Sequence, residues 1–215
     1  MGHNVAALVR VMLVTDDHLL RGQDLLQVAL SAQRGGITSF QIRFKQTPDR
    51  ELVALARSLV AALEVPVLVN DRPDVAIAAG AAGVHLGPDD LPVDLARQIA
   101  PSGFLIGASV GSEAEAGRAG KADYWGIGPW RVTATKQDAG AALGLDGFKQ
   151  LVRLAGPRPC IAIGGILPDD IATVAKAGGS GVAVVSGILG AADVEAAARH
   201  YAGQLLRAGF AVPRS

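Results

Sequence analysis

Short apolar runs alternate along this chain with longer segments in which apolar residues recur at the spacing of a helix. The runs are apolar on both faces, which is typical of strands in a parallel sheet covered by helices. Strands are therefore predicted at residues 11–15, 37–43, 66–70, 83–86, 104–109, 123–127, 159–163 and 181–185. Helices are predicted at residues 24–34, 48–63, 73–80, 92–100, 112–120, 146–155, 169–177 and 191–207.

About eight strand–helix units follow one another at nearly constant spacing, and eight is the number that closes a TIM barrel. The predicted α/β fold is a single-domain (β/α)8 TIM barrel over residues 1–215, frayed from about Val212. An open doubly wound sheet is the alternative, and a glycine fingerprint after the first strand would favour it. That fingerprint is lacking: Gly126-Ile127-Gly128 supplies half of one, but Arg131 stands at the third glycine position.

The composition fits one sizeable domain with an aliphatic core, because half of the 215 residues are hydrophobic but only 4% are aromatic. Twenty basic and twenty acidic residues cancel, so no general binding to nucleic acid or to a membrane surface is indicated. The one cysteine, Cys160, excludes an internal disulfide and a cysteine-based zinc cluster. Its place in an apolar strand favours a buried, inert thiol.

No targeting or membrane segment is apparent in the sequence. Arg10 interrupts the N-terminal apolar stretch, Asp16 and Asp17 follow it, and no apolar run reaches the roughly 18 residues of a transmembrane helix. A soluble cytoplasmic protein is therefore expected. The sequence leaves open whether the protein forms a homo-oligomer.

Two strand ends in the last quarter of the chain predict a phosphate site. Residues 162–166 (Ala-Ile-Gly-Gly-Ile) and 184–187 (Val-Val-Ser-Gly) are apolar runs that end abruptly in small residues and lead into helical patterns. Glycine lets an anion approach the backbone amides closely, and the loops after strands seven and eight usually hold phosphate in such a barrel. The alternative is that Gly164-Gly165 forms only a tight turn.

The end of the second strand turns three polar side chains to one face. Alternation along residues 41–45 places Gln41, Arg43 and Lys45 on one side, and Ile42 and Phe44 on the other. An inward arginine is costly unless an anion meets it. This favours an anion-binding barrel mouth over a solvated edge.

Carboxylates follow the next two strands. Asp71 comes directly after strand three, and Asp90 comes shortly after strand four. Carboxylates at adjacent strand ends can share Mg²⁺, which takes oxygen ligands and keeps waters and phosphate oxygens. The alternative makes each aspartate the N-cap of the helix that follows it. His85, within strand four and without a second histidine nearby, is interpreted as structural.

The fifth and sixth strands are followed by further hydrogen-bond donors. Ser109 ends strand five, and the loop after strand six carries Thr133, Thr135 and Lys136, which suit a phosphate or a leaving diphosphate. A surface loop with incidental threonines and lysine is the alternative. The sequence has no Ser-His-Asp order, no Cys-x-x-Cys and no glycosidase-like pair of glutamates. The set therefore indicates a metal-assisted group transfer in which diphosphate leaves.

Taken in order, these motifs resemble the thiamine-phosphate synthase family over about residues 11–190. They are Met12-Leu13-Val14-Thr15-Asp16, the Gln-x-Arg-x-Lys of 41–45, Asn70-Asp71-Arg72, Gly83-Val84-His85-Leu86-Gly87 with Asp89-Asp90, Ile106-Gly107-Ala108-Ser109, Thr-x-Thr-Lys, Ala-Ile-Gly-Gly-Ile and Val-Val-Ser. The family is a TIM barrel that, with Mg²⁺, joins 4-amino-2-methyl-5-(hydroxymethyl)pyrimidine diphosphate to a thiazole phosphate, in either its plain or its carboxylated form. The products are thiamine phosphate and diphosphate.

The resemblance implies a role for each matching residue. Contacts to the pyrimidine diphosphate would come from Gln41, Arg43, Lys45, Asn70, Ser109 and Lys136, with Arg43, Lys45, Ser109 and Lys136 acting in catalysis. Contacts to the thiazole phosphate would come from Thr133, Thr135, Gly165, Val185 and Ser186, and Mg²⁺ would be held by Asp71 and Asp90. The resemblance also implies a dissociative path, in which diphosphate departs before the thiazole nitrogen attacks the pyrimidinyl-methyl cation.

The sequence departs from the family pattern in two places. The loop after strand six usually reads Gly-Pro-Val-Phe-Pro-Thr, and here Trp130-Arg131-Val132 replaces its middle. Phe44 stands where an acidic residue is common, on the side that should face away from the site.

Two other functions are open to a barrel of this kind. A thiazole tautomerase would not need the two aspartates or the Thr-x-Thr-Lys set. A non-catalytic sensor of a phosphorylated ligand would not need a Mg²⁺ site. Because both features are present, the sequence favours the synthase.

Overall fold

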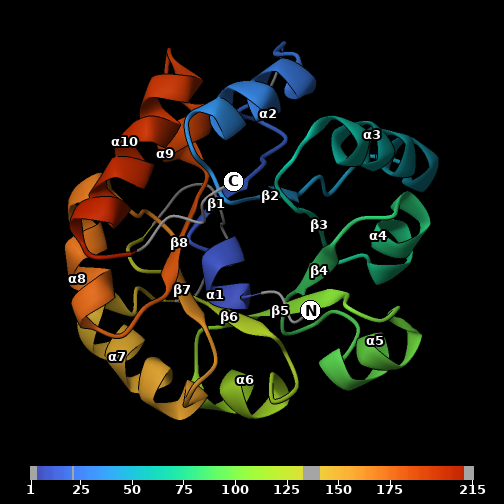
Figure 1. Cartoon of the computed structure of the whole chain (residues 1–215). Coiled ribbons are helices and arrows are strands. Elements are labelled where there is room, and N and C mark those ends of the chain that lie inside the picture. The colour runs from blue at the N-terminus through green and yellow to red at the C-terminus, as the bar shows by residue number, and fades with distance from the viewer. Residues whose placement is uncertain (1–3, 21, 133–140, 211–215) are drawn as a thin grey trace.

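Eight parallel strands close into a barrel, as the sequence predicts (Figure 1). The computed structural model describes residues 4–20, 22–132 and 141–210. The strands pair in sequence order, and β1 pairs with β8 to close the sheet, which rules out the open doubly wound alternative. Their bounds are β1 Val11–Val14, β2 Ser39–Ile42, β3 Val67–Asn70, β4 Gly83–Leu86, β5 Leu105–Val110, β6 Tyr124–Ile127, β7 Cys160–Ile163 and β8 Gly181–Val184.

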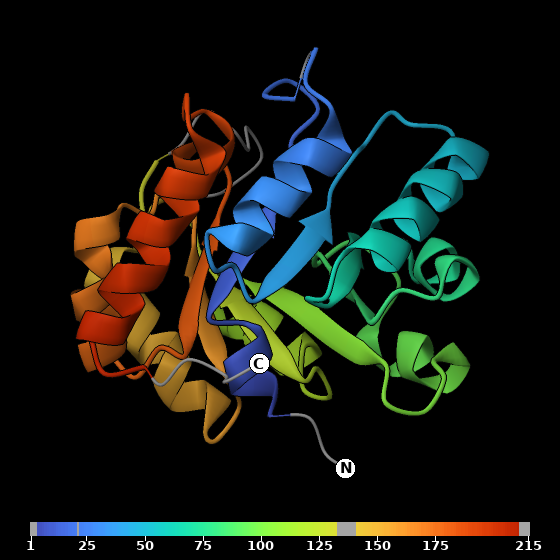
Figure 2. The ribbon, with the colours of Figure 1, turned by 45° about the horizontal axis from the view of Figure 1, so that its top comes forward.

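Helices form the outer layer around the strands, except α1, which lies across one opening of the barrel (Figure 1, Figure 2). Their bounds are α1 Val5–Leu8, α2 Leu25–Arg34, α3 Asp49–Ala62, α4 Pro73–Ala79, α5 Val93–Ile99, α6 Glu113–Arg118, α7 Gly144–Ala155, α8 Ile171–Lys176, α9 Ser186–Leu189 and α10 Val194–Arg207, with a 3-10 turn, η1, at Pro168–Asp170. The sequence pattern does not predict α1 and α9, because four residues are too few to display helical periodicity.

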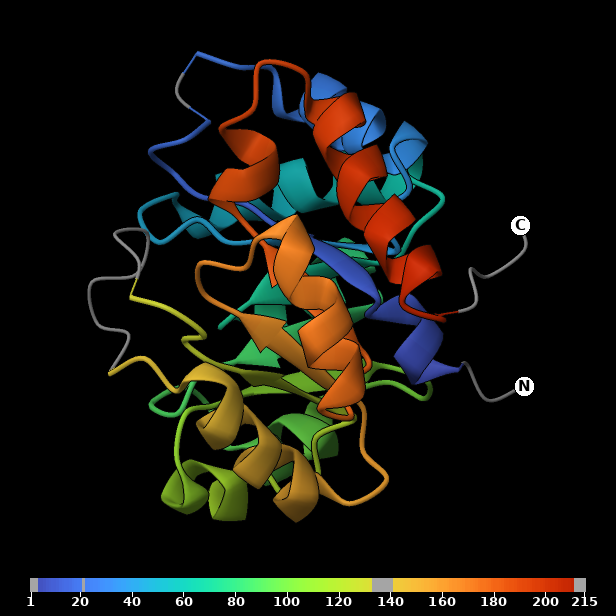
Figure 3. The ribbon, with the colours of Figure 1, turned by 90° about the vertical axis from the view of Figure 1, so that its left-hand side faces the viewer.

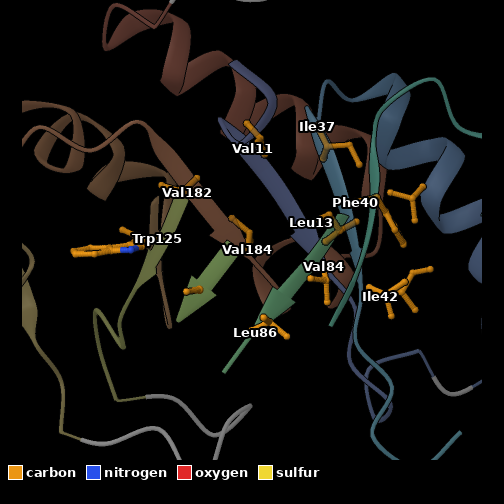
Figure 4. Close-up of a cluster of buried hydrophobic side chains, with 14 of the residues drawn as sticks. Val11, Leu13, Ile37, Phe40, Ile42, Val84, Leu86, Trp125, Val182 and Val184 are labelled. Atoms are coloured by element: carbon orange, nitrogen blue, oxygen red, sulfur yellow. The ribbon is translucent and has the colours of Figure 1, made fainter. Parts of the chain in front are cut away.

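Two hydrophobic clusters fill the molecule, one on each face of the strands. Alternate strand residues such as Leu13, Phe40, Val84 and Val184 pack between the sheet and the helices (Figure 4). The residues between them in sequence point into the barrel, where they form a second cluster of Val9, Met12, Val14, Leu68, Tyr124, Ile161 and Ala183. Both clusters are mainly aliphatic, as the composition predicts. The strands are therefore buried on both faces, and this burial stabilises the barrel.

Small residues make room for the two large polar side chains inside the barrel. A Cβ at Gly107 would lie 2.2 Å from the ring of Tyr124, and one at Gly126 would lie 3.0 Å from the ring of His85. Glycine at these two positions therefore lets Tyr124 and His85 occupy the interior. A larger residue would force the neighbouring strands or rings to move.

The two ends of the barrel differ. Helix α1 lies across the opening in Figure 1, and its Val5 packs against the interior cluster. Figure 3 shows α1 on one side of the molecule and the segments that follow the strands on the other. The carboxyl ends of the strands, where the sequence predicts the site, thus lie at the end opposite α1.

Two predictions made from composition can be checked in the fold. Cys160 is buried, and its burial raises the pKa of the thiol to about 12, which confirms the expected inert thiol. Within the described ranges, no helix is both long enough and apolar enough to cross a membrane. Residues from Val212 onward lie outside the described part of the chain.

Candidate active site at the carboxyl ends of the strands

Strand β2 turns its polar residues as alternation predicts. Gln41 is buried and donates from Nε2 to Sδ of Met12, a residue of the interior cluster, at 3.2 Å. Ile42 belongs to the outer cluster, and Phe44 packs against that cluster from its edge. The family departure at Phe44 thus lies on the outer face of the strand, away from the barrel interior.

The Arg43 backbone is fixed from β1. Its amide donates to Thr15 Oγ1 at 2.7 Å, and Thr15 Oγ1 donates to the Arg43 carbonyl at 3.2 Å. The guanidinium is largely buried, with 16% of the side chain exposed, and its Nη1 lies 3.7 Å from Asp16 Oδ2. Asp16 also accepts from the amides of His18 and Leu19, so this carboxylate is already shared among several donors. The ion pair between Arg43 and Asp16 is therefore long, and Asp16 balances the charge of Arg43 only in part.

The two predicted metal ligands lie together. Asp71 has φ of +64°, which only a few non-glycine residues adopt, and its amide donates to the His85 carbonyl at 2.8 Å. Burial, and then a hydrogen bond to Asp90 and the charge of Asp90, raise the pKa of Asp71 to about 7. The positive charges of Lys45 and Arg43 act on the same carboxylate in the opposite direction. The ends of β2, β3 and β4 therefore meet at one place.

Neither aspartate is a helix cap. The N-cap of α4 is Arg72 and that of α5 is Pro92, and neither helix has a side-chain capping bond. Asp90 instead accepts from the Gly87 amide at 2.6 Å, which folds its carboxylate back toward the end of β4. The capping alternative for Asp71 and Asp90 is wrong.

Arg72 belongs to the motif of Asp71 but lies in a different environment. Its guanidinium donates to both carboxylate oxygens of Asp49 in α3 and to those of Asp74 in α4. These contacts lie on the outer helices and are partly exposed. Arg72 therefore joins two helices, and its charge is balanced there.

A hydrogen-bonded row crosses the barrel interior to Ser109. Ring nitrogen Nδ1 of His85 lies 3.0 Å from the Tyr124 hydroxyl, and Nε2 lies 3.0 Å from Ser109 Oγ. Burial keeps Tyr124 protonated by raising its pKa, so the hydroxyl can donate to Nδ1. Both ring nitrogens of His85 are therefore engaged, one by Tyr124 and the other by Ser109. Asn70 pairs in register with His85, which puts it on the same interior layer.

The turns after β7 and β8 present backbone amides. Gly164 and Gly165 have φ of +90° and +70°, a conformation that glycine adopts readily. Within the described ranges, the amides of Gly165, Ile166 and Val185 donate no hydrogen bond. Strands β7 and β8 are neighbours, so these amides come from adjacent strand ends, as a phosphate site requires.

Three predicted site residues, Thr133, Thr135 and Lys136, lie outside the described residues. Trp130 and Arg131, which precede them, are described. Trp130 is buried and stacks edge-on against Phe148 of α7. Arg131 forms an ion pair with Asp170 of η1.

The carboxylate pair suits a hard divalent cation. Asp71 and Asp90 supply only oxygen atoms, and their mutual repulsion is what a bound cation would relieve. In the described part of the chain no group of three or more His, Cys, Asp or Glu side chains gathers as a metal cage would require. Two carboxylates alone leave coordination positions for waters and for oxygens of a phosphorylated ligand, which is how Mg²⁺ is usually bound.

The chain matches a family model described as thiamine monophosphate synthase over residues 11–188. It belongs to this family. A thiamine-phosphate synthase of Methanoculleus marisnigri is 48% identical over 191 residues, which cover 86% of this chain and 90% of that protein. One of Azorhizobium caulinodans is 44% identical over 192 residues, covering 87% and 90%. The structure of a thiamine phosphate pyrophosphorylase from Pyrococcus furiosus aligns with a TM-score of 0.84 at 35% identity, covering 95% of this chain and 99% of that one.

Membership of the thiamine monophosphate synthase family confirms the resemblance drawn from the ordered motifs. It also confirms the prediction of a transferase of thiamine biosynthesis on a TIM barrel. The match ends within α9, so it includes every strand end that carries a predicted site residue.

Three residues that the sequence reasoning gave no role make contacts at or near the site. Asp16 faces Arg43, Tyr124 holds His85, and Asp170 pairs with Arg131. The sequence could have indicated Asp16 as a site residue, because it is the last residue of the first family motif. No such indication exists for Tyr124 or Asp170, since each lies 39 residues from its partner along the chain.

Proposed function

We propose that this protein joins the pyrimidine diphosphate to the thiazole phosphate, forms thiamine phosphate and releases diphosphate. The observation that carries the proposal is the meeting of Asp71 and Asp90 with the charges of Arg43 and Lys45 at one end of the barrel. A leaving diphosphate needs a cation and positive side chains around it. A tautomerase or a sensor would need neither the carboxylate pair nor its position beside these charges.

Asp71 and Asp90 are the proposed ligands of Mg²⁺. When bound, this ion would neutralise negative charge on the diphosphate and so make it a better leaving group. Asp71 has the elevated pKa of a carboxylate that lacks a cation, and metal binding would displace its proton.

The remaining charged and polar groups are assigned to the pyrimidine diphosphate. Arg43, Lys45 and Lys136 would stabilise the charge that grows on the diphosphate as its bond to the methylene carbon breaks, with both bonding electrons leaving on oxygen. Gln41, Asn70 and Ser109 would orient the pyrimidine, and Ser109 Oγ is itself held 3.0 Å from His85 Nε2. The thiazole nitrogen then attacks the methylene carbon, so no protein nucleophile is required.

The thiazole phosphate is assigned to the turns after β7 and β8. Gly165, Val185 and Ser186 would contact its phosphate, together with Thr133 and Thr135. The support is that the amides of Gly165 and Val185 have no internal acceptor in the described part of the chain. Glycine at 165 also lets an anion approach the backbone. Placing the two substrates at neighbouring strand ends would bring the nitrogen to the carbon it attacks.

The proposal is tested by incubating the purified protein with both substrates and Mg²⁺. Release of diphosphate and formation of thiamine phosphate should proceed in equal amounts, and EDTA should stop both. Diphosphate release that needs no thiazole phosphate, or thiazole isomerisation without diphosphate release, would count against the proposal.

Two neighbouring aspartates give a matched control for the metal assignment. Asp90→Asn should reduce turnover by about 100-fold or more, because a metal ligand loses its charge. Asp89→Asn changes the adjacent, exposed carboxylate and should leave turnover within about 2-fold. Equal losses in the two variants would remove Asp90 from the metal site. The cytoplasmic location and a homo-oligomer stay predictions.

A further inference from the structure

The turn after β7 is held by the segment that follows β6. Three consecutive carbonyls of this turn are engaged from there. Ile163 O accepts from the Trp130 amide at 2.8 Å, Gly164 O from the Arg131 amide at 2.9 Å, and Gly165 O from Arg131 Nη1 at 3.0 Å. Fixing three successive peptide planes fixes the direction of the amides between them.

A carboxylate closes the same turn from its other side. Asp170, 9% exposed, accepts from both Nη1 and Nη2 of Arg131 and from the Leu167 amide, the last at 2.8 Å. Burial works against the charge of Asp170 most strongly. Hydrogen bonds from Arg131, the Leu167 amide and Trp130 nevertheless hold its pKa below the ordinary value. Asp170 is therefore ionised at neutral pH. Its carboxylate accepts hydrogen bonds from Arg131 and from the Leu167 amide, which both belong to or hold the turn.

Trp130 and the turn that it holds are anchored to the rest of the barrel. The Trp130 ring packs edge-on against Phe148, with ring centroids 5.6 Å apart. The Gly144 amide at the start of α7 donates to the Trp130 carbonyl at 3.3 Å. On the far side, the buried Tyr201 hydroxyl of α10 donates to Ile166 O at 2.9 Å. The turn is therefore held by the segment after β6 and by α10, and Trp130 of that segment is held by α7.

We infer that Trp130, Arg131 and Asp170 act as a positioning unit, which aims the amides of Gly165 and Ile166 at the phosphate of the thiazole substrate. The inference rests on the proposed function. It also gives a role to Trp130 and Arg131, two of the three residues that depart from the family pattern.

Arg131 directs its guanidinium into the turn and toward Asp170. Nη1 is shared between Gly165 O and Asp170, and Nη2 is bonded to Asp170. The carboxylate also balances the guanidinium charge. Three of the five guanidinium N–H groups are thus engaged within the protein, whereas the amides of Gly165 and Ile166 have no partner within the described ranges. Arg131 is accordingly a positioning residue.

The experiment compares Arg131→Gln and the isosteric Asp170→Asn with the unaltered protein in full kinetics for both substrates. We expect KM for the thiazole phosphate to rise about 10-fold, with kcat and KM for the pyrimidine diphosphate within about 2-fold. The double variant should resemble the single ones, because either change releases the same turn. Asp170→Asn decides the question if Arg131→Gln does not fold.

The barrel supplies a matched control at its other end. Arg97 donates to Asp123 and to the Phe104 carbonyl, and Asp123 also accepts from the Ile106 amide. Like Arg131 and Asp170, this pair thus joins an arginine, an aspartate and backbone groups. Arg97→Gln should lower Tm without changing either KM. If Arg131→Gln lowers only Tm as well, or changes both KM values alike, the inference is wrong.

Calorimetric titration with the thiazole phosphate alone separates this inference from the proposed function. Should the unaltered protein release no diphosphate, the proposed function fails, and the binding titration then decides the inference by itself. Binding about 10-fold weaker in Arg131→Gln and in Asp170→Asn supports it. Equal binding in the variants and the unaltered protein overturns it.

Discussion

The two ends of the barrel use the same kind of contact for different purposes. At the amino-terminal end, Arg97 and Asp123 bind each other and the backbone around β5 and β6, and α1 covers the opening. At the carboxyl-terminal end, Asp71 lies against Asp90, a like charge, and has φ of +64°. One end places opposite charges together, whereas the other brings two carboxylates together.

This difference indicates which end was built for a ligand. A carboxylate pair with an elevated pKa lowers the stability of the folded protein at neutral pH, so it is kept for a reason other than folding. The Arg131–Asp170 unit resembles the amino-terminal contact in its hydrogen bonds, but it holds a turn whose amides are unengaged in the described chain. The hydrogen bonds of Arg131 and Asp170 thus lie beside the proposed site and hold the turn that forms part of it.

The largest expected effect comes from removing a charge at the carboxyl-terminal end. Asp71→Asn should reduce kcat by about 100-fold to 1,000-fold, because a metal ligand is lost. Asparagine tolerates a positive φ, so the backbone should not change. Steady-state kinetics with both substrates measures the effect.

Asp74→Asn is the control for Asp71→Asn. Asp74 lies three residues further along and pairs with Arg72 on the outer helices. Its variant should keep turnover within about 2-fold. If Asp74→Asn were as damaging as Asp71→Asn, the loss would have to be attributed to the helix α4 region in general.

A charge removed at the amino-terminal end should affect stability alone. Asp123→Asn weakens the bonds from Arg97 and from the Ile106 amide, and we expect a loss of about 1–2 kcal/mol in the free energy of unfolding. Urea denaturation measures this loss, and kcat should stay within about 2-fold. A large fall in kcat at a temperature where the variant is folded would contradict the prediction that contacts at the amino-terminal end affect stability alone.

The pH dependence of stability tests the same contrast without substrate. The pKa of Asp71 is about 7 in the folded protein and near the ordinary 3.8 when unfolded, so the folded state holds this proton more tightly. The stability from this group is present below about pH 4 and is lost as pH rises to 7. In EDTA, the unaltered protein should therefore lose about 1–2 kcal/mol relative to Asp71→Asn between pH 5 and pH 8, after allowance for solvent screening.

Denaturation curves of the two proteins at both pH values measure this difference. Addition of Mg²⁺ at pH 8 should restore part of the stability of the unaltered protein and little of that of Asp71→Asn. Parallel pH profiles for the two proteins would mean that Asp71 titrates normally.

The smallest effect is expected from a substitution in the barrel interior, between the two ends. Tyr124→Phe removes the hydroxyl that holds His85 Nδ1, which should cost about 1 kcal/mol of stability. Because the hydroxyl is separated from Ser109 by the His85 ring, turnover should fall by no more than about 5-fold. Thermal denaturation and kinetics with varied pyrimidine diphosphate measure both. A loss comparable to that of Asp71→Asn would show that the interior row takes a direct part in the reaction.

Local sequence patterns predicted the fold closely because they depend on near neighbours. The strand at 83–86 is observed as β4 Gly83–Leu86, and the others differ by a few residues at their ends. Asp24 begins α2, where its carboxylate accepts from the amides of Leu26 and Gln27. The four-residue helices α1 and α9 have too few turns to leave a pattern, so only the structure revealed them.

The sequence alone determined the barrel, the chemistry of its strand ends and the family, because periodicity and ordered motifs are properties of the chain itself. Only the tertiary structure decided that Asp71 is not a cap but lies against Asp90, that His85 bridges Tyr124 and Ser109, and that Arg131 pairs with Asp170. Those contacts join different strand ends, and their partners are set by how eight units close on one another. The spacing of residues along the chain does not show which side chains come within hydrogen-bond distance when the barrel closes.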